Sequence, residues 1–475
     1  MAEATYNFGM IGLGTMGRNL LLNMASHGVP VAGYDISAAQ VALFEKEGEG
    51  KPVKGFTNLE EMVQSLTKPR AIMMLVPAGK PVDNVISNVK PFLKAGDIII
   101  DGGNSHFTDT VLRDQALDSE GFHFFGMGIS GGEEGARKGP SMMPGGDKEA
   151  YLTLKPIFEA IAAKVDGDPC VTYVGPGASG HFVKMVHNGI EYGLMQLIAE
   201  TYEILRKGLQ LEDAAIQQLF AKWNEGRLQS FLIEVTRDIF MVKAEGADHL
   251  LVNDIKDQAR SKGTGKWTSQ VAMDLEVPIP TIDMAVAMRN LSKYKSVRTE
   301  AAQLYGDKKP VLNVDQEAFL SDLEQALYFS VIVTYAQGLH LLTRASATYS
   351  YDLQLSEIAK IWRGGCIIRS TLLNDIYNAY KAEPNLENLL LDGQVSTLVQ
   401  EILPATRSVV STSLGAGIAI PALAASLTYF ETFQSENMPS NLIQAQRDYF
   451  GAHTYELIGK EGVFHTNWMP LPSKP

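Results

Sequence analysis

The stretch Phe8–Gly17 (FGMIGLGTMG) joins a short apolar run to a turn in which Gly12, Gly14 and Gly17 follow the spacing G-x-G-x-x-G. Between a strand and a helix, glycines at this spacing allow a tight turn, a close approach of the backbone to a pyrophosphate and close packing of the helix on the strand. Free N–H groups at the start of the helix then face the phosphates. The stretch therefore predicts a dinucleotide-binding domain. The alternative is a glycine turn with a structural role only.

Short apolar runs alternate with helix-like segments along the N-terminal part of the chain. Near-continuous apolar strands separated by helices indicate a parallel sheet that helices cover on both faces. The sequence therefore predicts an α/β domain of the Rossmann type over residues 1–177. The expected strands are Phe8–Ile11, Val29–Tyr34, Ile72–Val76, Ile98–Ile100, Phe122–Phe125 and Val171–Val174. Helical patterns lie between them at Arg18–Met24, Ser37–Lys46 and Thr108–Asp118.

An acidic residue strengthens the prediction of a dinucleotide site. Asp35 ends the second expected strand, at the usual distance beyond the glycine motif. A carboxylate at this position can accept a hydrogen bond from a ribose 2′-hydroxyl.

Gly175–Gly180 (GPGASG) interrupts the alternation, and helical periodicity dominates after it. We expect a large all-helical domain for substrate binding and dimerisation over residues 178–435. The last segment, residues 436–475, is rich in Asn, Gly, Pro and His and predicts an irregular tail.

Two segments of the helical region resemble each other. Trp223–Leu232 (WNEGRLQSFL) and Trp362–Leu372 (WRGGCIIRSTL) each follow a long helix candidate, at Phe182–Leu205 and Ala318–Leu342 respectively. A duplicated helical unit explains this similarity, and chance resemblance between helices is the alternative.

The composition limits the partners and the compartment. The chain of 475 residues has a formal net charge of −13, which argues against nucleic-acid binding through a basic surface. An acidic protein that binds an anionic substrate must gather basic side chains in one pocket. Cys170 and Cys366 are the only cysteines, and they lack the spacing of metal ligands. We therefore expect no metal site, no disulfide framework and a cytoplasmic location.

No membrane segment is expected either. Met1–Asn7 lacks the basic segment and apolar core of a signal peptide. The longest apolar stretch, Gly415–Phe430, is interrupted by Pro421 and by polar residues. It predicts a buried helix, since a membrane span needs a longer uninterrupted apolar run.

A second group of residues carries chemistry. The segment His181–Glu200 (HFVKMVHNGIEYGLMQLIAE) is a helix candidate with a polar stripe at i, i+3, i+4, i+7 and i+8. The stripe consists of Lys184, His187, Asn188, Glu191 and Tyr192. Apolar residues at Val186, Ile190, Leu194 and Leu197 form a separate face that can be buried. The alternative is a solvated face with a Lys–Glu pair.

Burial of this stripe would change its acid–base properties. Desolvation lowers the pKa of a lysine and raises that of a glutamate. Lys184 and Glu191 could then act as general base and general acid, each contributing on the order of 10²–10⁴-fold to the rate.

At this point the residues resemble a known family. Met10–Gly17 is similar to the fingerprint of β-hydroxyacid dehydrogenases, and further blocks narrow the resemblance to the 6-phosphogluconate dehydrogenases. These blocks are Ile98–Ser105 (IIIDGGNS), Gly128–Gly146 (GISGGEEGARKGPSMMPGG), His181–Tyr192 (HFVKMVHNGIEY), Lys262–Trp267 (KGTGKW), Trp362–Ser370 (WRGGCIIRS) and Gln444–Leu457 (QAQRDYFGAHTYEL). They are spread over nearly the whole chain.

The resemblance implies an oxidative decarboxylase that converts 6-phosphogluconate to ribulose 5-phosphate and CO₂ without a metal. Lys184 would accept the proton of the substrate 3-hydroxyl and later act as an acid at the new carbonyl. Glu191 would protonate C1 of the enediol. The resemblance also implies a homodimer in which Arg447 and His453 reach the active site of the partner subunit.

The same resemblance assigns two sets of contacts. For the substrate they are Asn104, Ser130, Gly131, Gly132, His187, Asn188, Tyr192, Lys262, Arg289, Arg447 and His453. For the cofactor they are Gly12, Leu13, Gly14, Thr15, Met16, Gly17, Asp35, Ile36, Ser37, Val76, Pro77, Ala78 and Asn104. Lys262, Arg289 and Arg447 would supply the local positive charge that a phosphate needs.

One departure from the family pattern concerns the cofactor. Members that use NADP typically carry Asn-Arg-Thr after the second strand, whereas this chain has Asp35-Ile36-Ser37. A carboxylate near the 2′-position repels a phosphate, and isoleucine supplies no counter-charge. Pro77 also stands where a lysine is common. We therefore expect a preference for NAD, with NADP as the family default and the alternative.

Two other functions compete with this prediction. A β-hydroxyacid dehydrogenase that does not decarboxylate would share the glycine motif and the lysine but would not need Glu191. A dinucleotide-binding protein without catalytic activity would need neither Lys184 nor Glu191.

Overall fold

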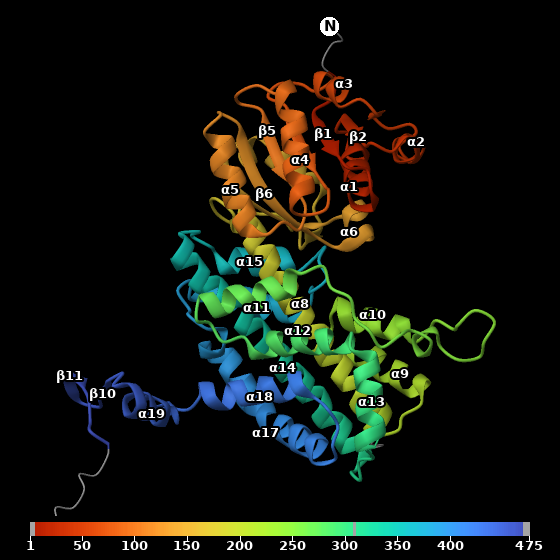
Figure 1. Ribbon diagram of the computed structural model, residues 1–475. Coiled ribbons are helices and arrows are strands. Elements are labelled where there is room, and N and C mark those ends of the chain that lie inside the picture. Colours follow the sequence, from red (N-terminus) through yellow and green to blue (C-terminus); the bar gives the residue numbers. More distant parts are fainter. Residues whose placement is uncertain (1–4, 307–309, 469–475) are drawn as a thin grey trace, which may run out of the picture. The chain divides into compact units, whose positions relative to one another are not determined.

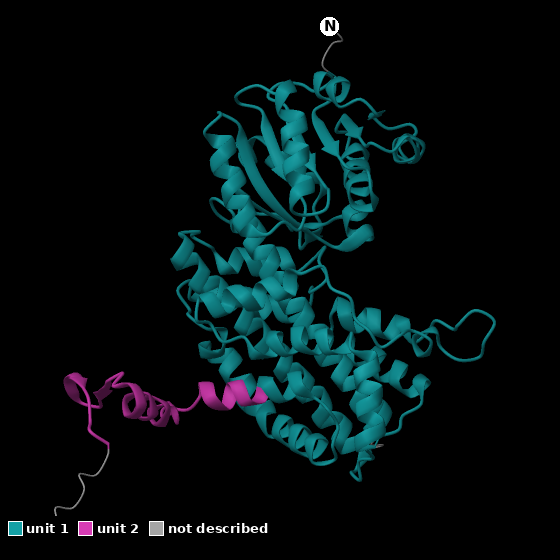
Figure 2. Ribbon diagram, in the orientation of Figure 1, with its two compact units in different colours: residues 1–426 teal, residues 427–475 magenta. Residues whose placement is uncertain are grey.

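The structure is a computed structural model, and it describes residues 5–306 and 310–468. The chain divides into two compact units, residues 1–426 and residues 427–475 (Figure 2). Each unit is described by itself below.

The first unit begins with a seven-stranded sheet (Figure 1). The strands follow the order β3 (Val53–Phe56), β2 (Val31–Tyr34), β1 (Phe8–Ile11), β4 (Ala71–Met74), β5 (Ile98–Asp101), β6 (His123–Ser130) and β7 (Ser141–Gly146). All neighbours are parallel except β6 and β7, which are antiparallel. Met10 of β1 is in register with Gly33 of β2 and Met73 of β4.

Helices cover both faces of this sheet, as predicted. Phe8 and Met10 of β1 belong to one buried apolar cluster, whereas Ile11 belongs to the cluster on the other face. The same alternation occurs in β5, where Ile99 faces away from its neighbours Ile98 and Ile100. The helices are α1 (Thr15–Ser26), α2 (Ala38–Glu47), α3 (Leu59–Gln64), α4 (Lys80–Val89), α5 (Phe107–Asp118), α6 (Gly132–Lys138) and α7 (Lys148–Ile161), with the 3₁₀ turn η1 (Lys90–Phe92).

Five of the six expected strands are present, and the sixth is wrong. Val171–Val174 forms only isolated bridges beside β7, from Val171 to Met142 and from the neighbouring Gly175 to Gly145. The segment lies along the sheet edge without a continuous ladder. Two further strands were not expected: β3, in which only Gly55 is buried, and β7, whose Pro144 and glycines are unusual in strands. Two strands of two residues each, β8 (Lys164–Val165) and β9 (Asp168–Pro169), pair with each other before the helical region begins.

The rest of the first unit is helical, as predicted. Its helices are α8 (Ser179–Glu203), α9 (Asp213–Trp223), α10 (Phe231–Ile239), α11 (Thr264–Asp274), α12 (Pro280–Ser292), α13 (Lys295–Tyr305), α14 (Gln316–Tyr349), α15 (Leu355–Trp362), α16 (Leu372–Ala382) and α17 (Gly393–Gly415). Helix α18 (Pro421–Phe433) begins in this unit, and the short turns η2 (Ile204–Gly208), η3 (Leu251–Asn253) and η4 (Leu389–Leu391) complete the set.

Two details concern the apolar helices. The expectation of one helix over Gly415–Phe430 was wrong, because α17 ends at Gly415 and α18 begins at Pro421, where proline is tolerated. By length and composition alone, α14 could cross a membrane, but 83% of its apolar window is buried inside the protein. That burial is typical of a core helix.

The two similar segments follow the same order of elements. In each half a long helix (α8 or α14) precedes a helix that ends at a buried tryptophan, Trp223 in α9 and Trp362 in α15. A helix follows in both halves, α10 and α16. This repeated order favours a duplicated helical unit.

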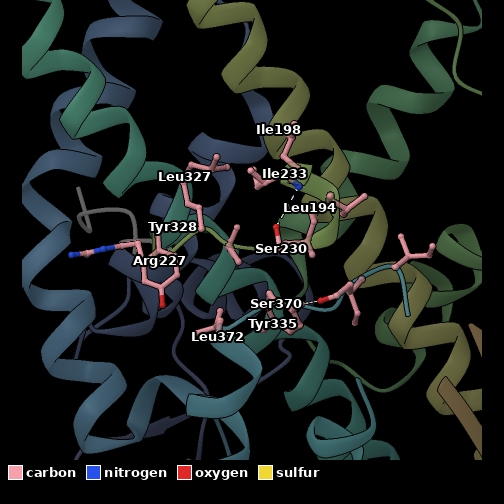
Figure 3. Close-up of a pocket in the computed structure, with 15 residues that line it drawn as sticks. Leu194, Ile198, Arg227, Ser230, Ile233, Leu327, Tyr328, Tyr335, Ser370 and Leu372 are labelled. Atoms are coloured by element: carbon pink, nitrogen blue, oxygen red, sulfur yellow. Dashed lines mark hydrogen bonds between the residues drawn. The ribbon is translucent and has the colours of Figure 1, made fainter. Parts of the chain in front are cut away.

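The two segments also pair with each other. Ser230 and Ser370 form an antiparallel bridge, and Phe231 N–H donates to the carbonyl of Arg369 at 3.0 Å. Residues of both segments line a small apolar cavity of ≈ 30 Å³ (Figure 3). This volume holds only about one or two water molecules. The cavity is therefore a small gap where the two segments pack together, with no room for a substrate.

The second unit is more regular than the predicted irregular tail. After the end of α18 it contains α19 (Ser440–Gly451) and an antiparallel hairpin of β10 (Tyr455–Leu457) and β11 (Lys460–Phe464). The boundaries at residues 177 and 435 stay predictions.

Candidate active site

The glycine motif lies at the carboxyl end of β1, and each glycine has a separate structural reason. Gly12 adopts φ +98°, and a Cβ there would lie 2.6 Å from the carbonyl oxygen of Leu75. A Cβ on Gly17 would lie 1.9 Å from the carbonyl oxygen of Gly12, so only glycine lets α1 pack this closely on β1. A Cβ on Gly14 would meet nothing within 4 Å. The backbone at Gly14 is therefore open to a phosphate group, and the motif fits a dinucleotide.

A cleft of ≈ 730 Å³ adjoins this motif. It brings together residues that follow three strands, β1, β4 and β5, where parallel strands present their carboxyl ends to a ligand. Of the expected contacts it contains Gly14, Thr15, Met16, Gly17, Val76, Pro77, Ala78, Asn104 and Lys262. The sequence analysis did not select Leu75, Gly102, Gly103, Ile129 or Trp267, which also line the cleft.

Asp35 ties the end of β2 to the glycine turn. One carboxylate oxygen accepts from Leu13 N–H at 2.8 Å, and the other accepts from Ser37 N–H at 2.8 Å. The side chain of Ile36 is 89% exposed. Arg18 lies nearby but is engaged by Glu47 at 3.3 Å and by other acceptors. The end of β2, which is hydrogen-bonded to the glycine turn beside the cleft, therefore carries a carboxylate and an exposed apolar side chain.

The polar stripe lies on α8, which packs directly against β6 and β7. A Cβ on Gly126 would lie 2.6 Å from the His181 ring, and a Cβ on Gly128 would lie 2.4 Å from Cβ of Lys184. Because Gly126 and Gly128 have no side chains, α8 packs directly against the backbone of β6. Since Ile129 follows Gly128 and lines the cleft, Lys184 is held close to the dinucleotide site.

Three buried groups of α8 form one polar cluster. Lys184 Nζ donates to Asn188 Oδ1 at 2.7 Å and lies 3.4 Å from Nδ1 of His187. His187 Nε2 lies 3.3 Å from Oγ of Ser130, which also accepts from Ile367 N–H at 3.4 Å. All three α8 side chains are at most 7% exposed. The alternative of a solvated face is therefore excluded.

The stripe continues one turn further along α8. Glu191 Oε2 lies 4.0 Å from Nδ1 of His187. The guanidinium of Arg289 stacks 3.7 Å from the centre of the Tyr192 ring, and a Cβ on Gly265 would collide with that ring at 2.4 Å. Helices α11 and α12 therefore fix the far end of the stripe and place a cation beside it.

Burial shifts the acid–base properties as the sequence predicted. Burial lowers the pKa of Lys184, although the charge of Glu191 opposes this shift. Burial raises the pKa of Glu191, against the effects of Lys184 and Arg289. Burial and the charge of Lys184 also hold the pKa of His187 well below its ordinary value. Lys184 therefore loses its proton at a lower pH than an exposed lysine does, and Glu191 keeps its proton to a higher pH than an exposed glutamate does.

The remaining expected residues lie in two places. Gly131 and Gly132 begin α6, and a Cβ on Gly131 would lie 2.6 Å from the carbonyl oxygen of Gly365. Arg447 and His453 belong to the second unit, so their part in this site stays a prediction. Among the described residues, no group of three or more His, Cys, Asp or Glu side chains could hold a metal ion.

The sequence analysis missed one aromatic neighbour of the cluster. The Trp362 ring lies edge-to-face with His187, with ring centres 5.5 Å apart. Trp362 is the first residue of the block WRGGCIIRS. The only physical sign of its contact with His187 is that its side chain is buried at the end of α15.

The fold and the site together define a dinucleotide-dependent oxidoreductase with a Rossmann-type domain and a helical domain that carries the acid–base groups. Two family models match the chain. The model of the NAD binding domain of 6-phosphogluconate dehydrogenase matches residues 7–175, and that of the C-terminal domain matches residues 180–468. The chain belongs to the 6-phosphogluconate dehydrogenase family.

Individual relatives agree over nearly the full length. The NADP(+)-dependent, decarboxylating 6-phosphogluconate dehydrogenase of Bacillus subtilis (strain 168) is 50% identical over 463 residues, 97% of this chain and 98% of that protein. The decarboxylating enzyme of Escherichia coli (strain K12) is 47% identical over 97% of this chain and 98% of its own. The Plasmodium falciparum 6-phosphogluconate dehydrogenase, solved alone, with NADP⁺ and with 6-phosphogluconate, superposes with a TM-score of 0.95. It is 44% identical, and the match covers 97% of this chain and 100% of that one.

Proposed function

We propose that the chain catalyses the oxidative decarboxylation of 6-phosphogluconate to ribulose 5-phosphate and CO₂. The observation that carries this proposal is the buried stripe of α8, in which Lys184 and Glu191 have oppositely shifted pKa values and Lys184 lies against Gly128, next to Ile129 of the cleft. Relatives of this chain carry the same activity in their names.

Lys184 performs the first proton transfer. Its neutral Nζ accepts the proton of the 3-hydroxyl, and the C3–O bond becomes a carbonyl. A nicotinamide dinucleotide held by Gly14, Val76 and the other residues of the cleft would supply the oxidising power, as the acceptor of the C3 hydrogen and its electron pair. The hydrogen bond from Nζ to Asn188 holds the amine in place, and the neutral His187 beside it adds no opposing charge. Burial favours the neutral amine, as a general base requires.

The same lysine and Glu191 complete the reaction. A carboxylate β to a carbonyl loses CO₂ readily, because the bond electrons pass to the carbonyl, and protonated Lys184 gives its proton to that carbonyl oxygen, so that a neutral enediol forms. Glu191 then donates its proton to the carbon that lost CO₂, which becomes C1 of ribulose 5-phosphate, while the hydroxyl on the neighbouring carbon returns its proton to Lys184 and becomes the carbonyl of the product. No metal is required, because the carbonyl itself takes up the electrons.

The substrate contacts are proposed at the positions of the family pattern. Ser130, His187 and Asn188 already form one hydrogen-bonded group, and Arg289 lies beside Tyr192. Lys262 and Arg289, with Arg447 and His453 from the partner of a homodimer, would bind the phosphate and carboxylate. Such an enzyme would work in the cytoplasm and needs neither a membrane nor a nucleic acid.

We also propose that NAD is the preferred cofactor. Both oxygens of Asp35 are fixed by hydrogen bonds beside the glycine turn, and the neighbouring Ile36 is exposed and uncharged. A 2′-phosphate near Asp35 would meet a carboxylate, whereas a 2′-hydroxyl could donate to it. The named relative from B. subtilis depends on NADP(+), so the preference of this chain departs from it.

One assay tests the reaction. Purified protein is given 6-phosphogluconate with each cofactor, and both reduced cofactor and CO₂ are measured. The proposal requires one CO₂ per reduced cofactor. Reduced cofactor without CO₂ would instead show a dehydrogenase that does not decarboxylate, and full activity of a Lys184→Ala variant would overturn the mechanism.

A further inference from the structure

Helix α19 buries a charged residue and exposes its apolar ones. Of its described residues only Asp448 is buried, at 0% exposure, while Leu442, Ile443, Tyr449 and Phe450 are at least 58% exposed. Burying a carboxylate costs free energy unless donors satisfy it. The second unit therefore has a polar centre where a small module would ordinarily have an apolar one.

Four donors converge on this carboxylate. Oδ1 accepts from Thr454 N–H at 2.9 Å and from Nδ1 of His465 at 2.8 Å. Oδ2 accepts from Thr466 N–H at 3.0 Å and from the indole Nε1 of Trp468 at 2.8 Å. Burial would raise the pKa of Asp448, but these hydrogen bonds outweigh it and lower the pKa, so the carboxylate stays charged. Asp448 thus connects α19 with the turn after it and with the segment beyond the hairpin.

The turn beside Asp448 is strained. Ala452 and Thr454 adopt φ values of +48° and +62°, although neither is glycine, and Thr454 is β-branched. Such conformations persist only where the surroundings hold them. The carbonyl of Asp448 accepts from Ala452 N–H at 2.9 Å, and its carboxylate accepts from Thr454 N–H. The two strained residues flank His453.

The same network reaches Arg447. Its guanidinium donates to Gln444 Oε1 at 3.0 Å, and Gln444 Nε2 donates to the carbonyl of Thr454 at 2.6 Å. The network thus links the side chain of Arg447 to the strained turn that carries His453. Asp448 itself points inward and presents no oxygen to a ligand, since its side chain is fully buried.

From these contacts we infer that Asp448 is a positioning residue that holds Arg447 and His453 in one fixed arrangement for binding the substrate's anionic groups. The inference rests on the proposed function and adds to it. The second unit is then already ordered before the substrate binds, because the hydrogen bonds to Asp448 hold its segments together.

Steady-state kinetics of Asp448→Asn test this directly. Asparagine keeps the shape but cannot accept at both positions, so Arg447 and His453 lose their fixed arrangement. We expect KM for 6-phosphogluconate to rise by roughly tenfold or more, as in Arg447→Ala, while KM for the cofactor stays within about twofold. The matched control is Glu461→Gln, an exposed carboxylate in the same unit. An unchanged KM for 6-phosphogluconate in Asp448→Asn would overturn the inference.

A rescue experiment tests whether Asp448 acts by holding the strained turn or only through its charge. Glycine adopts positive φ without cost, so Ala452→Gly should recover part of the KM lost in Asp448→Asn. No recovery would argue that Asp448 does not act by holding the turn.

A third experiment does not depend on activity. Hydrogen exchange of the full-length wild type should show protected amides at Thr454 and Thr466, and Asp448→Asn should lose this protection while residues 5–426 keep theirs. A wild type inactive on 6-phosphogluconate would refute the proposed function, yet this exchange would still report whether Asp448 orders the unit. Protection retained in the variant would overturn the inference even in an active enzyme.

Discussion

Lys184 Nζ lies 2.7 Å from Oδ1 of Asn188, one turn further along α8, and the pair is buried against β6. This hydrogen bond holds the Lys184 amine in a position where burial lowers its pKa and so favours its neutral form. The relationship explains why a helix can supply both a base and the group that orients it.

Removal of the Lys184 amine should therefore lower kcat much more than it weakens substrate binding. In Lys184→Ala we expect kcat to fall by about 10²–10⁴-fold, because the methyl group of alanine cannot accept the 3-hydroxyl proton. The control is Lys155→Ala, since Lys155 is 45% exposed in α7. An equal loss in both variants would point to a general effect of lost charge.

Glu191→Gln should slow a later step. Glutamine cannot donate a proton to the enediol, so protonation becomes rate-limiting and kcat falls by about 10²–10⁴-fold. With substrate deuterated at C3, the kinetic isotope effect should fall towards one, whereas Lys184→Ala should keep it. A full isotope effect in Glu191→Gln would show that Glu191 acts before or during oxidation.

The pH dependence should follow from the two shifted groups. Lys184 must be neutral to accept a proton, so kcat/KM falls as pH drops below its pKa, which burial has lowered. Glu191 must be protonated to donate, so the rate falls as pH rises above its pKa, which burial has raised. The profile should be bell-shaped, with apparent values that belong to the coupled pair. Glu191→Gln should lose the alkaline limb only, and retention of that limb would assign it to another group.

The cofactor preference should change with two substitutions at the cleft edge. Asp35→Asn removes the repelling carboxylate, and Ile36→Arg adds a donor for a 2′-phosphate. Hydrogen bonds to charged groups are worth about 1.5–3 kcal/mol, so the ratio of kcat/KM for NADP over NAD should rise by roughly 10–150-fold. Ile255→Arg is the control, because Ile255 is also exposed, at 63%, but lies in the helical region. A wild type that already favours NADP tenfold would refute the premise.

Glu200 should make stability depend on pH. Its buried carboxylate accepts from Ala422 N–H and Leu423 N–H at the start of α18, and burial raises its pKa to about 7 despite these bonds. A raised pKa in the folded state means that the folded protein binds the proton more tightly than the unfolded chain. Stability from this group is therefore complete below about pH 4.3 and is lost as pH rises through about 7.

Glu200→Gln should remove this dependence. We expect its free energy of unfolding to match the wild type near pH 4 and to exceed it by about 1–3 kcal/mol near pH 8. Urea unfolding at the two pH values measures this, with Glu203→Gln as the control on the same helix, where Glu203 pairs with Lys207 at 2.6 Å. A wild type with equal stability at both pH values would contradict the prediction.

Local sequence determined much of this molecule. The spacing of Gly12, Gly14 and Gly17 predicted a strand, a turn and a helix, and the steric limit at Gly17 is local, since it is set by the carbonyl oxygen of Gly12. The stripe from Lys184 to Tyr192 needed only helical periodicity. Where the signal was weak, the prediction failed: β7 contains a proline and two glycines, and a Cβ on Gly145 would lie 2.2 Å from the backbone nitrogen of Gly180 in α8.

Tertiary structure decided what periodicity cannot express. Whether the stripe faces solvent or a buried site depends on the glycines of β6, which let α8 approach the sheet and remove Lys184 from water. The contact of Trp362 with His187 and the four donors around Asp448 likewise join residues that are distant in sequence or in different elements. The sequence by itself determined which chemical groups are available. Only packing decided their pKa values and partners, because both depend on desolvation and on neighbours that the chain brings together when it folds.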